Sequence, residues 1–301
     1  MMNSITTKDL CYTIGSKTIL NNINLTIPEG SIYGYLGRNG AGKSTTIKLL
    51  LGLLEVNGDP IFIQNKSLKQ YRTEILSTTG NLIESPCFYT KLTVYENLKY
   101  LDIVYGKGQK RIDEVLELVD LQREKKKKAS ALSMGMKQRL GIAMAIFHDP
   151  KLLILDEPLN GLDPQGIFEM RKLFQHLNDE GKTIFLSSHI LSELEKTATH
   201  IGIIEGGEMV FQGTKNELLS QVEKDVVLRT DQPEKALSVV QESFTATLNS
   251  DNKISVRIND DKDFHLLLKN LIQNGIEIYD IDSQNTNLEQ IFINLISKKN
   301  D

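Results

Sequence analysis

The sequence lacks several features that would place the protein in other classes. Its two cysteines, Cys11 and Cys87, lie far apart without C-x-x-C spacing, so we expect neither a disulfide framework nor a zinc site. No segment approaches the ~20 consecutive apolar residues that a membrane span needs. Residues 1–10 hold no apolar stretch typical of a secretory signal. We therefore expect a cytoplasmic protein that reaches a membrane only through a partner.

The chain also has no large excess of positive or negative charge. The formal net charge is −4, so no overall positive field favours nucleic acid or anionic lipid. We expect no nucleic-acid partner.

The length and composition favour two domains. The chain has 301 residues, of which 40% are hydrophobic, enough for one large α/β core and a smaller second domain. The pattern changes near residue 220, where short half-exposed strands begin to alternate with helices. We expect a first domain at 1–220 and a C-terminal α+β domain at 221–301. Its pattern, β-α-β-β-α-β with a final helix at 287–297, is that of a ferredoxin-like fold.

The most informative motif is a glycine-rich stretch that fits G-x-x-x-x-G-K-[ST]. An apolar strand at 31–36 precedes it and a helical pattern at 46–51 follows it, which is the context that the motif requires. The sequence therefore predicts a phosphate-binding loop for a nucleoside triphosphate, made of Gly37, Arg38, Asn39, Gly40, Ala41, Gly42, Lys43, Ser44 and Thr45.

The residue types in this loop suit phosphate chemistry. The glycines let successive N–H groups turn toward one anion at the start of a helix. Lys43 adds a positive charge for the β- and γ-phosphates, and the Ser44 hydroxyl is placed to bind Mg²⁺. We expect Thr45 to contact the α-phosphate.

A second motif places two acids after a buried strand. The apolar residues 152–155 are followed by Asp156 and Glu157, and charged residues at such a place are costly unless a metal–nucleotide pairs with them. We expect Asp156 to bind Mg²⁺ and Glu157 to act as general base toward the attacking water. The alternative is a strand end that simply reaches solvent.

The remaining pattern predicts the architecture. Residues 152–155 are apolar, and residues 183–187 hold an apolar run between Thr183 and Ser187. Such runs are expected of parallel strands buried on both faces, so we expect the core to be a doubly wound α/β sheet. Residues 5–36 predict an antiparallel β-subdomain. Apolar residues at three- and four-residue spacing predict a helical insertion at about 86–147.

A distinctive motif stands at the start of the helix that follows residue 132. Residues 132–139 read Leu-Ser-Met-Gly-Met-Lys-Gln-Arg, where Ser133 is a candidate N-cap and the Gly135 amide can meet an anion. With this stretch shortly before the Asp-Glu strand, the chain resembles the ATP-binding subunits of ABC transporters. The resemblance implies a P-loop NTPase fold of the ABC type. It also implies that Ser133, Gly135 and Met136 of one subunit close on ATP held by another.

Two further stretches of the sequence match motifs of this family. Residues 160–163, Asn-Gly-Leu-Asp, match the loop that places Asp163 at the dimer interface. The sequence Ser-Ser-His at 187–189 matches the family's switch histidine, which implies that His189 contacts the γ-phosphate and holds the attacking water. A purely structural histidine is the alternative.

Two positions differ from the usual family pattern. Glu84 stands where the family usually has a glutamine, and a carboxylate there could bind Mg²⁺ and accept from water. Residues 82–86, Leu-Ile-Glu-Ser-Pro, resemble the bacitracin-resistance and lantibiotic-immunity type of transporter, which carries glutamate in this loop.

Ile14 stands at the position where the family has an aromatic residue that stacks on adenine, so Tyr12, on the same strand face, is the candidate for this contact. It could equally be a surface tyrosine.

The resemblance leads to a specific function. We expect an ATPase that uses ATP and Mg²⁺, pairs with a second ATP-binding subunit, as a homodimer or as a heterodimer with a different chain, and powers a separate membrane permease. Its place would be the inner face of the cell membrane, and its role the export of antimicrobial peptides. The alternative is a soluble ABC-type ATPase acting on the ribosome or on nucleic acid, although such proteins usually carry two cassettes or a long coiled-coil insert.

Overall fold

The computed structural model describes residues 2–220, 224–249, 251–258 and 261–284. The chain forms two compact units, Met1–Lys215 and Asn216–Asp301, which are treated separately below. The helix expected at 287–297 lies outside the described residues. In the part of the chain that the structure covers, no helix has the length and apolar character needed to cross a membrane.

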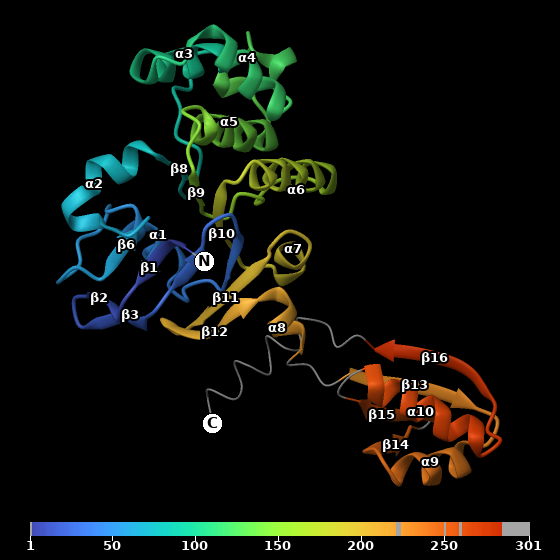
Figure 1. The fold of residues 1–301 in the computed structure, drawn as a ribbon. Coiled ribbons are helices and arrows are strands. Elements are labelled where there is room, and N and C mark those ends of the chain that lie inside the picture. Colours follow the sequence, from blue (N-terminus) through green and yellow to red (C-terminus); the bar gives the residue numbers. More distant parts are fainter. Residues whose placement is uncertain (1, 221–223, 250, 259–260, 285–301) are drawn as a thin grey trace. The chain divides into compact units, whose positions relative to one another are not determined.

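A six-stranded sheet forms the centre of the first unit (Figure 1). Its order is β12-β11-β5-β10-β9-β8, and all neighbours pair in parallel except β12, which runs antiparallel to β11. The strands are β5 (Ile32–Leu36), β8 (Thr79–Leu82), β9 (Leu152–Leu155), β10 (Thr183–Ser188), β11 (His200–Glu205) and β12 (Glu208–Thr214).

The three central strands of this sheet are buried along their whole length. Every residue of β5, β9 and β10 is buried, as expected for parallel strands. The ring of Phe185 lies 5.8 Å from the ring of Tyr33 and 5.3 Å from that of Tyr35. This packing fixes the register of β5 against β10, and the ends of both strands carry candidate site residues.

The antiparallel β-subdomain contains a strand that the sequence pattern did not assign. A four-stranded sheet has the order β4-β1-β6-β7, and β2 pairs with β3 in a separate hairpin. Because β6 pairs with β1, a segment after the phosphate loop returns to complete this subdomain. The strands are β1 (Asn3–Thr7), β2 (Leu10–Ile14), β3 (Lys17–Ile23), β4 (Thr26–Pro28), β6 (Ile61–Ile63) and β7 (Lys66–Ser67).

Helices cover the sheet and form the predicted insertion. Figure 1 shows α3, α4 and α5 grouped together, apart from α1 and α2. A capping box between Thr93 and Glu96 starts α3, and Gly106 in the left-handed region ends it. The helices are α1 (Lys43–Leu50), α2 (Leu68–Ser77), α3 (Val94–Tyr105), α4 (Gly108–Leu118), α5 (Met134–Ile146), α6 (Pro164–Asp179) and α7 (Leu191–Glu195), with short 3₁₀ turns at Gln122–Glu124 and Ala129–Ala131. A further helix, α8 (Lys215–Ser220), begins at the last residue of this unit and continues into the second.

Close backbone contact positions α5 against the sheet. A Cβ atom on Gly80 of β8 would lie 2.2 Å from the Ala145 carbonyl oxygen, and one on Gly141 would lie 2.7 Å from Pro86 Cβ. Only glycine allows this approach, which fixes the helix carrying the signature against the strand that leads to Glu84.

The second unit is a small α+β domain. Its elements are β13 (Lys224–Thr230), α9 (Pro233–Gln241), β14 (Ala246–Leu248), β15 (Lys253–Ile258), α10 (Asp261–Gln273) and β16 (Ile278–Gln284). The antiparallel sheet has the order β14-β15-β13-β16. Apolar residues of its strands, among them Val226, Leu228 and Val256, form one core with residues of α9 and α10. The predicted fold class, a P-loop α/β domain with a small C-terminal α+β domain, is confirmed.

Candidate active site

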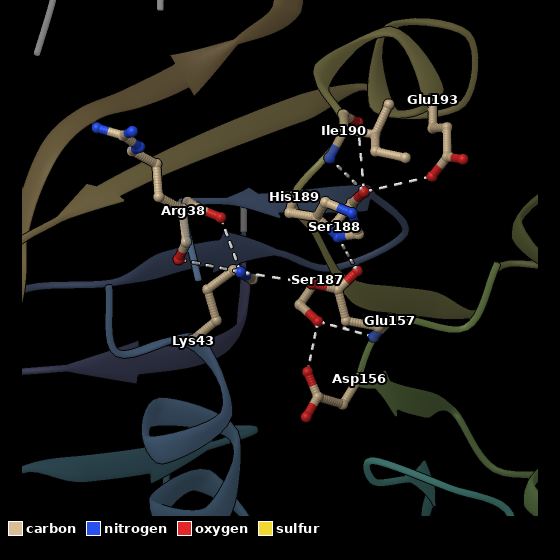
Figure 2. A network of polar contacts seen from close by, with 10 residues as sticks. Arg38, Lys43, Asp156, Glu157, Ser187, Ser188, His189, Ile190 and Glu193 are labelled. Atoms are coloured by element: carbon tan, nitrogen blue, oxygen red, sulfur yellow. Dashed lines mark hydrogen bonds and ion pairs between the residues drawn. The ribbon is translucent and has the colours of Figure 1, made fainter. Parts of the chain in front are cut away.

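The phosphate loop joins the end of β5 to the start of α1. The helix begins at Lys43, earlier than the pattern at 46–51 predicts, because the Thr46 amide already donates to the Gly42 carbonyl at 2.9 Å. The Lys43 side chain is 6% exposed, and its Nζ donates to the Gly37 carbonyl at 2.7 Å and to that of Arg38 at 3.4 Å. The ammonium group therefore lies inside the curl of the loop, as Figure 2 shows.

Gly42 explains why this loop tolerates no larger residue at the helix start. Its φ of 113° lies in the left-handed region, and a Cβ there would lie 2.6 Å from Leu20 Cδ2. The first N–H groups of a helix have no acceptor within the helix. Those of α1, which include Ser44 and Thr45, are therefore available to an anion beside the Lys43 ammonium.

The two acids after β9 lie beside this loop. Asp156 is 1% exposed, and its Oδ1 accepts the Ser187 hydroxyl at 2.6 Å. The same hydroxyl accepts the Glu157 amide at 2.9 Å. Ser187 at the end of β10 therefore holds both acids in place, and Figure 2 shows this bridge. The sequence analysis missed this role. The only signal for it is a polar residue at the end of a buried strand.

Glu157 lies between two nitrogen groups. Its Oε1 is 3.4 Å from Lys43 Nζ, and its Oε2 is 2.9 Å from His189 Nδ1. Glu157 is 18% exposed, and its backbone φ is 49°, which is unusual for a residue with a side chain. The structure thus brings Lys43, Glu157 and His189 into one cluster from the segments that follow three different strands, β5, β9 and β10.

The sheet order explains this cluster. β10 lies between β5 and β9, so the residues after β10 lie between the phosphate loop and the acids. In parallel strands the carboxyl ends meet at one edge, and this is where α/β sheets bind ligands. His189 is 37% exposed, which leaves it accessible to a ligand.

Glu193 on α7 adds a half-buried carboxyl group near the end of β10. The Ser188 hydroxyl accepts the Ile190 amide at 2.9 Å and lies 3.3 Å from Glu193 Oε2. Burial raises the pKa of Glu193 above its usual value, and the Ser188 hydroxyl opposes the shift. This carboxyl group is a further feature that the sequence analysis missed.

The signature residues pack on the loop that follows Glu157. Ser133 caps α5 by accepting the Met136 amide at 3.3 Å, and Asp163 caps α6 by accepting the Gly166 amide at 2.8 Å. A Cβ on Gly135 would lie 3.3 Å from Leu162 Cδ2.

These two caps are separate from the Lys43 cluster. Across the described ranges, no hydrogen bond or ion pair joins Ser133, Gly135, Met136 or Asp163 to Lys43, Glu157 or His189. Ser133 and Asp163 are both exposed.

Glu84 and Tyr12 lie outside the cluster. Glu84 is 62% exposed and forms an ion pair with Lys48 at 2.6 Å rather than with a group beside Asp156. Its role as a metal ligand stays a prediction. Tyr12 on β2 is half-buried against the core of the β-subdomain, whereas Ile14 is 58% exposed. Its contact with adenine also stays a prediction.

Comparisons with known proteins identify the family of this chain. Residues 20–160 match the family model described as ABC transporter. The chain is 41% identical to the bacitracin transport ATP-binding protein BcrA of Bacillus licheniformis, covering 98% of each chain. It is 42% identical to the lantibiotic transport ATP-binding protein SrtF of Streptococcus pyogenes, covering 68% of this chain and 88% of the relative.

A solved structure with the same fold has nucleotide products bound. The dimeric structure of a post-hydrolysis state of the ATP-binding cassette MJ0796, bound to ADP and Pi, aligns with a TM-score of 0.64 at 25% identity. The alignment covers 70% of this chain and 98% of that one.

The fold and the cluster define a P-loop nucleotide hydrolase. The relatives narrow this class, and the chain belongs to the family of ABC transporter ATP-binding proteins. It binds and hydrolyses ATP as one subunit of a multi-component transporter. The predictions of family and enzyme class are confirmed.

Proposed function

We propose that hydrolysis uses Glu157 as the general base, and the position of Glu157 between Lys43 and His189 carries this proposal. A carboxylate at the edge of the phosphate loop can accept a proton from a water that attacks the γ-phosphate. The Lys43 ammonium, which lies 3.4 Å from Glu157, would then turn to the γ-phosphate. The products are ADP and inorganic phosphate.

His189 would orient the water and the γ-phosphate. Its Nδ1 lies 2.9 Å from Glu157 Oε2, so the ring and the carboxylate face one small space. The amides at the start of α1 and the Lys43 ammonium would stabilise the charge that develops on the phosphoryl oxygens. Gly37, Gly40 and Thr45 would complete the phosphate contacts.

The residues present suit Mg²⁺ as the companion ion. Asp156 and Ser44 offer a carboxylate and a hydroxyl, the oxygen ligands that Mg²⁺ prefers. Within the described ranges, no three side chains of histidine, cysteine, aspartate or glutamate gather as a metal cluster. This composition suits an ion held by few protein groups, water and substrate phosphates. Bound there, Mg²⁺ would neutralise phosphate charge, with Glu84 as a further candidate ligand.

A second copy of the chain would complete each site. Ser133 and Asp163 are exposed and separate from the Lys43 cluster of their own chain. In a dimer, Ser133, Gly135 and Met136 of one subunit would face the γ-phosphate bound by the other. The Gly135 amide at the start of α5 would bind the anion. ATP would then hold the two subunits together.

The transporter would be a peptide-antibiotic exporter. The names of two relatives, which concern bacitracin and lantibiotic transport, support this cargo class. We propose that a separate permease spans the membrane and that this chain binds its inner face. Closure and opening of the ATPase dimer would drive the permease between two conformations.

The test of the catalytic assignment is Glu157→Gln in the full chain. The variant should bind ATP normally, because the amide keeps the shape of the side chain. Turnover should fall by about 10²–10⁴-fold, because general-base catalysis contributes about this factor. The matched control is Glu29→Gln, which removes an exposed carboxylate before β5. Rapid turnover by Glu157→Gln would disprove the assignment.

The cargo is tested in cells. A strain lacking the chain should become more sensitive to bacitracin or to lantibiotics, and the wild-type gene should restore resistance. The Glu157→Gln gene should fail to restore it at equal protein level. Unchanged sensitivity to both peptide classes would refute the proposed cargo while leaving the ATPase assignment intact.

A further inference from the structure

The ion pair between Glu84 and Lys48 links the expected metal ligand to the helix of the phosphate loop. Glu84 Oε1 lies 2.6 Å from Lys48 Nζ, and the two side chains are 62% and 35% exposed. Glu84 has a φ of 56°, in the left-handed region that residues with a side chain seldom adopt. The pair thus holds a strained backbone residue on the protein surface.

Lys48 is placed one helical turn from Ser44. Both belong to α1 (Lys43–Leu50), and residues four apart on a helix lie on the same face with Cβ atoms ~5–6 Å apart. The Ser44 and Lys48 side chains therefore lie next to each other on one face of the helix.

The loop of Glu84 is anchored close to Asp156. The Asp156 amide donates to the Leu82 carbonyl at 2.7 Å, so the chain is fixed two residues before Glu84. A change in the backbone of Ile83 and Glu84 alone could move the carboxylate along α1 without disturbing β8. Relief of the left-handed φ would favour such a change.

We propose that Lys48 is a positioning residue that holds Glu84 one helical turn away from Ser44 until Mg²⁺ and ATP bind. This inference rests on the proposed function, because it assumes a metal-dependent nucleotide site at Ser44 and Asp156. Lys48 and the metal then compete for one carboxylate. An exposed ion pair is weak, so a doubly charged ion displaces the ammonium readily.

The competition predicts a change in metal-dependent binding. Lys48→Met removes the competitor and frees Glu84, so Mg²⁺ should strengthen binding of a non-hydrolysable ATP analogue more than it does in the wild type. The quantity to measure is the dissociation constant in EDTA divided by that in MgCl₂. It should rise by about two- to fivefold, the range expected from an exposed pair. Lys48→Arg should keep the wild-type ratio.

A double-mutant cycle separates this effect from simple charge removal. Loss of a positive charge near a metal strengthens metal binding whether or not Glu84 responds. In the Glu84→Gln background this general effect remains, whereas the competition is gone. The two- to fivefold rise should therefore appear with Glu84 present and be largely lost in that background. Lys66→Met, which breaks the exposed Lys66–Glu74 pair on β7 and α2, is the matched control and should leave the ratio unchanged.

The outcomes distinguish this inference from the proposed function. Equal effects of Lys48→Met in both backgrounds, or no effect in either, would overturn the role of Lys48 while wild-type binding still depends on Mg²⁺. A wild-type chain that binds the analogue equally in EDTA and in MgCl₂ would overturn the proposed metal site, and this inference with it.

Discussion

Removing the Ser187 hydroxyl should damage both stability and catalysis. Ser187 is 0% exposed, and its Oγ donates to Asp156 Oδ1 at 2.6 Å while accepting the Glu157 amide at 2.9 Å. Ser187→Ala takes a hydrogen bond from a buried carboxylate and leaves a backbone N–H without its acceptor. Hydrogen bonds to charged groups contribute ~1.5–3 kcal/mol, and an unsatisfied buried group costs ~1–3 kcal/mol. We expect the free energy of unfolding to fall by about 3 kcal/mol.

The catalytic effect follows from the position of Glu157. Its backbone has a φ of 49°, and the Ser187 hydroxyl is the acceptor of its amide. Without this bond the Glu157 carboxylate, which we propose as the general base, can shift, and a displacement of about 1 Å can cost about a hundredfold in rate. We expect kcat to fall by about ten- to a hundredfold.

The assay compares Ser187→Ala with Ser188→Ala. Both serines lie at the end of β10 and are buried, but Ser188 contacts Ile190 and Glu193 rather than the two acids. Urea unfolding of the full chain gives the stability change, and phosphate release gives kcat. Ser188→Ala should lose about 1 kcal/mol and keep most of its turnover. If the two variants match in both measurements, the bridging role of Ser187 is refuted.

Two further predictions concern Glu193 and Tyr12. Burial raises the pKa of Glu193 above its usual 4.5, so the stability that the protonated carboxyl contributes is present at low pH and is lost as pH rises through the raised pKa. Glu193→Gln should therefore match the wild type near about pH 4 and unfold at higher urea near about pH 8; an equal difference at both pH values would contradict this cause. Tyr12→Ala should weaken ATP binding by about two- to tenfold, the equivalent of ~0.5–1.5 kcal/mol for an aromatic contact. Tyr71→Ala, at a tyrosine that is 47% exposed, should leave affinity unchanged, and equal affinities for all three proteins would exclude stacking.

The sequence alone determined the local features of the site. The phosphate loop can be predicted from the sequence because Gly42 must adopt a φ of 113° and because Lys43 and Ser44 must stand at the start of the helix. The two acids can be predicted as site residues because Asp156 and Glu157 directly follow an apolar strand, β9. Such features depend on neighbours in the chain, so a single sequence displays them. For the same reason the parallel strands could be predicted from continuous apolar runs.

The tertiary structure decided which of these features meet. Leu155 pairs with Leu186, and this register puts Asp156 beside Ser187, a contact that spans 31 residues of chain. The placement of β10 between β5 and β9 brings His189 to Glu157. Glu84 lies on Lys48 rather than beside Asp156 for a similar reason, since the nearest cation to a loop depends on how the loop packs. Strand order, register and loop packing result from side-chain contacts between distant segments, which the residue types at one place in the chain do not specify.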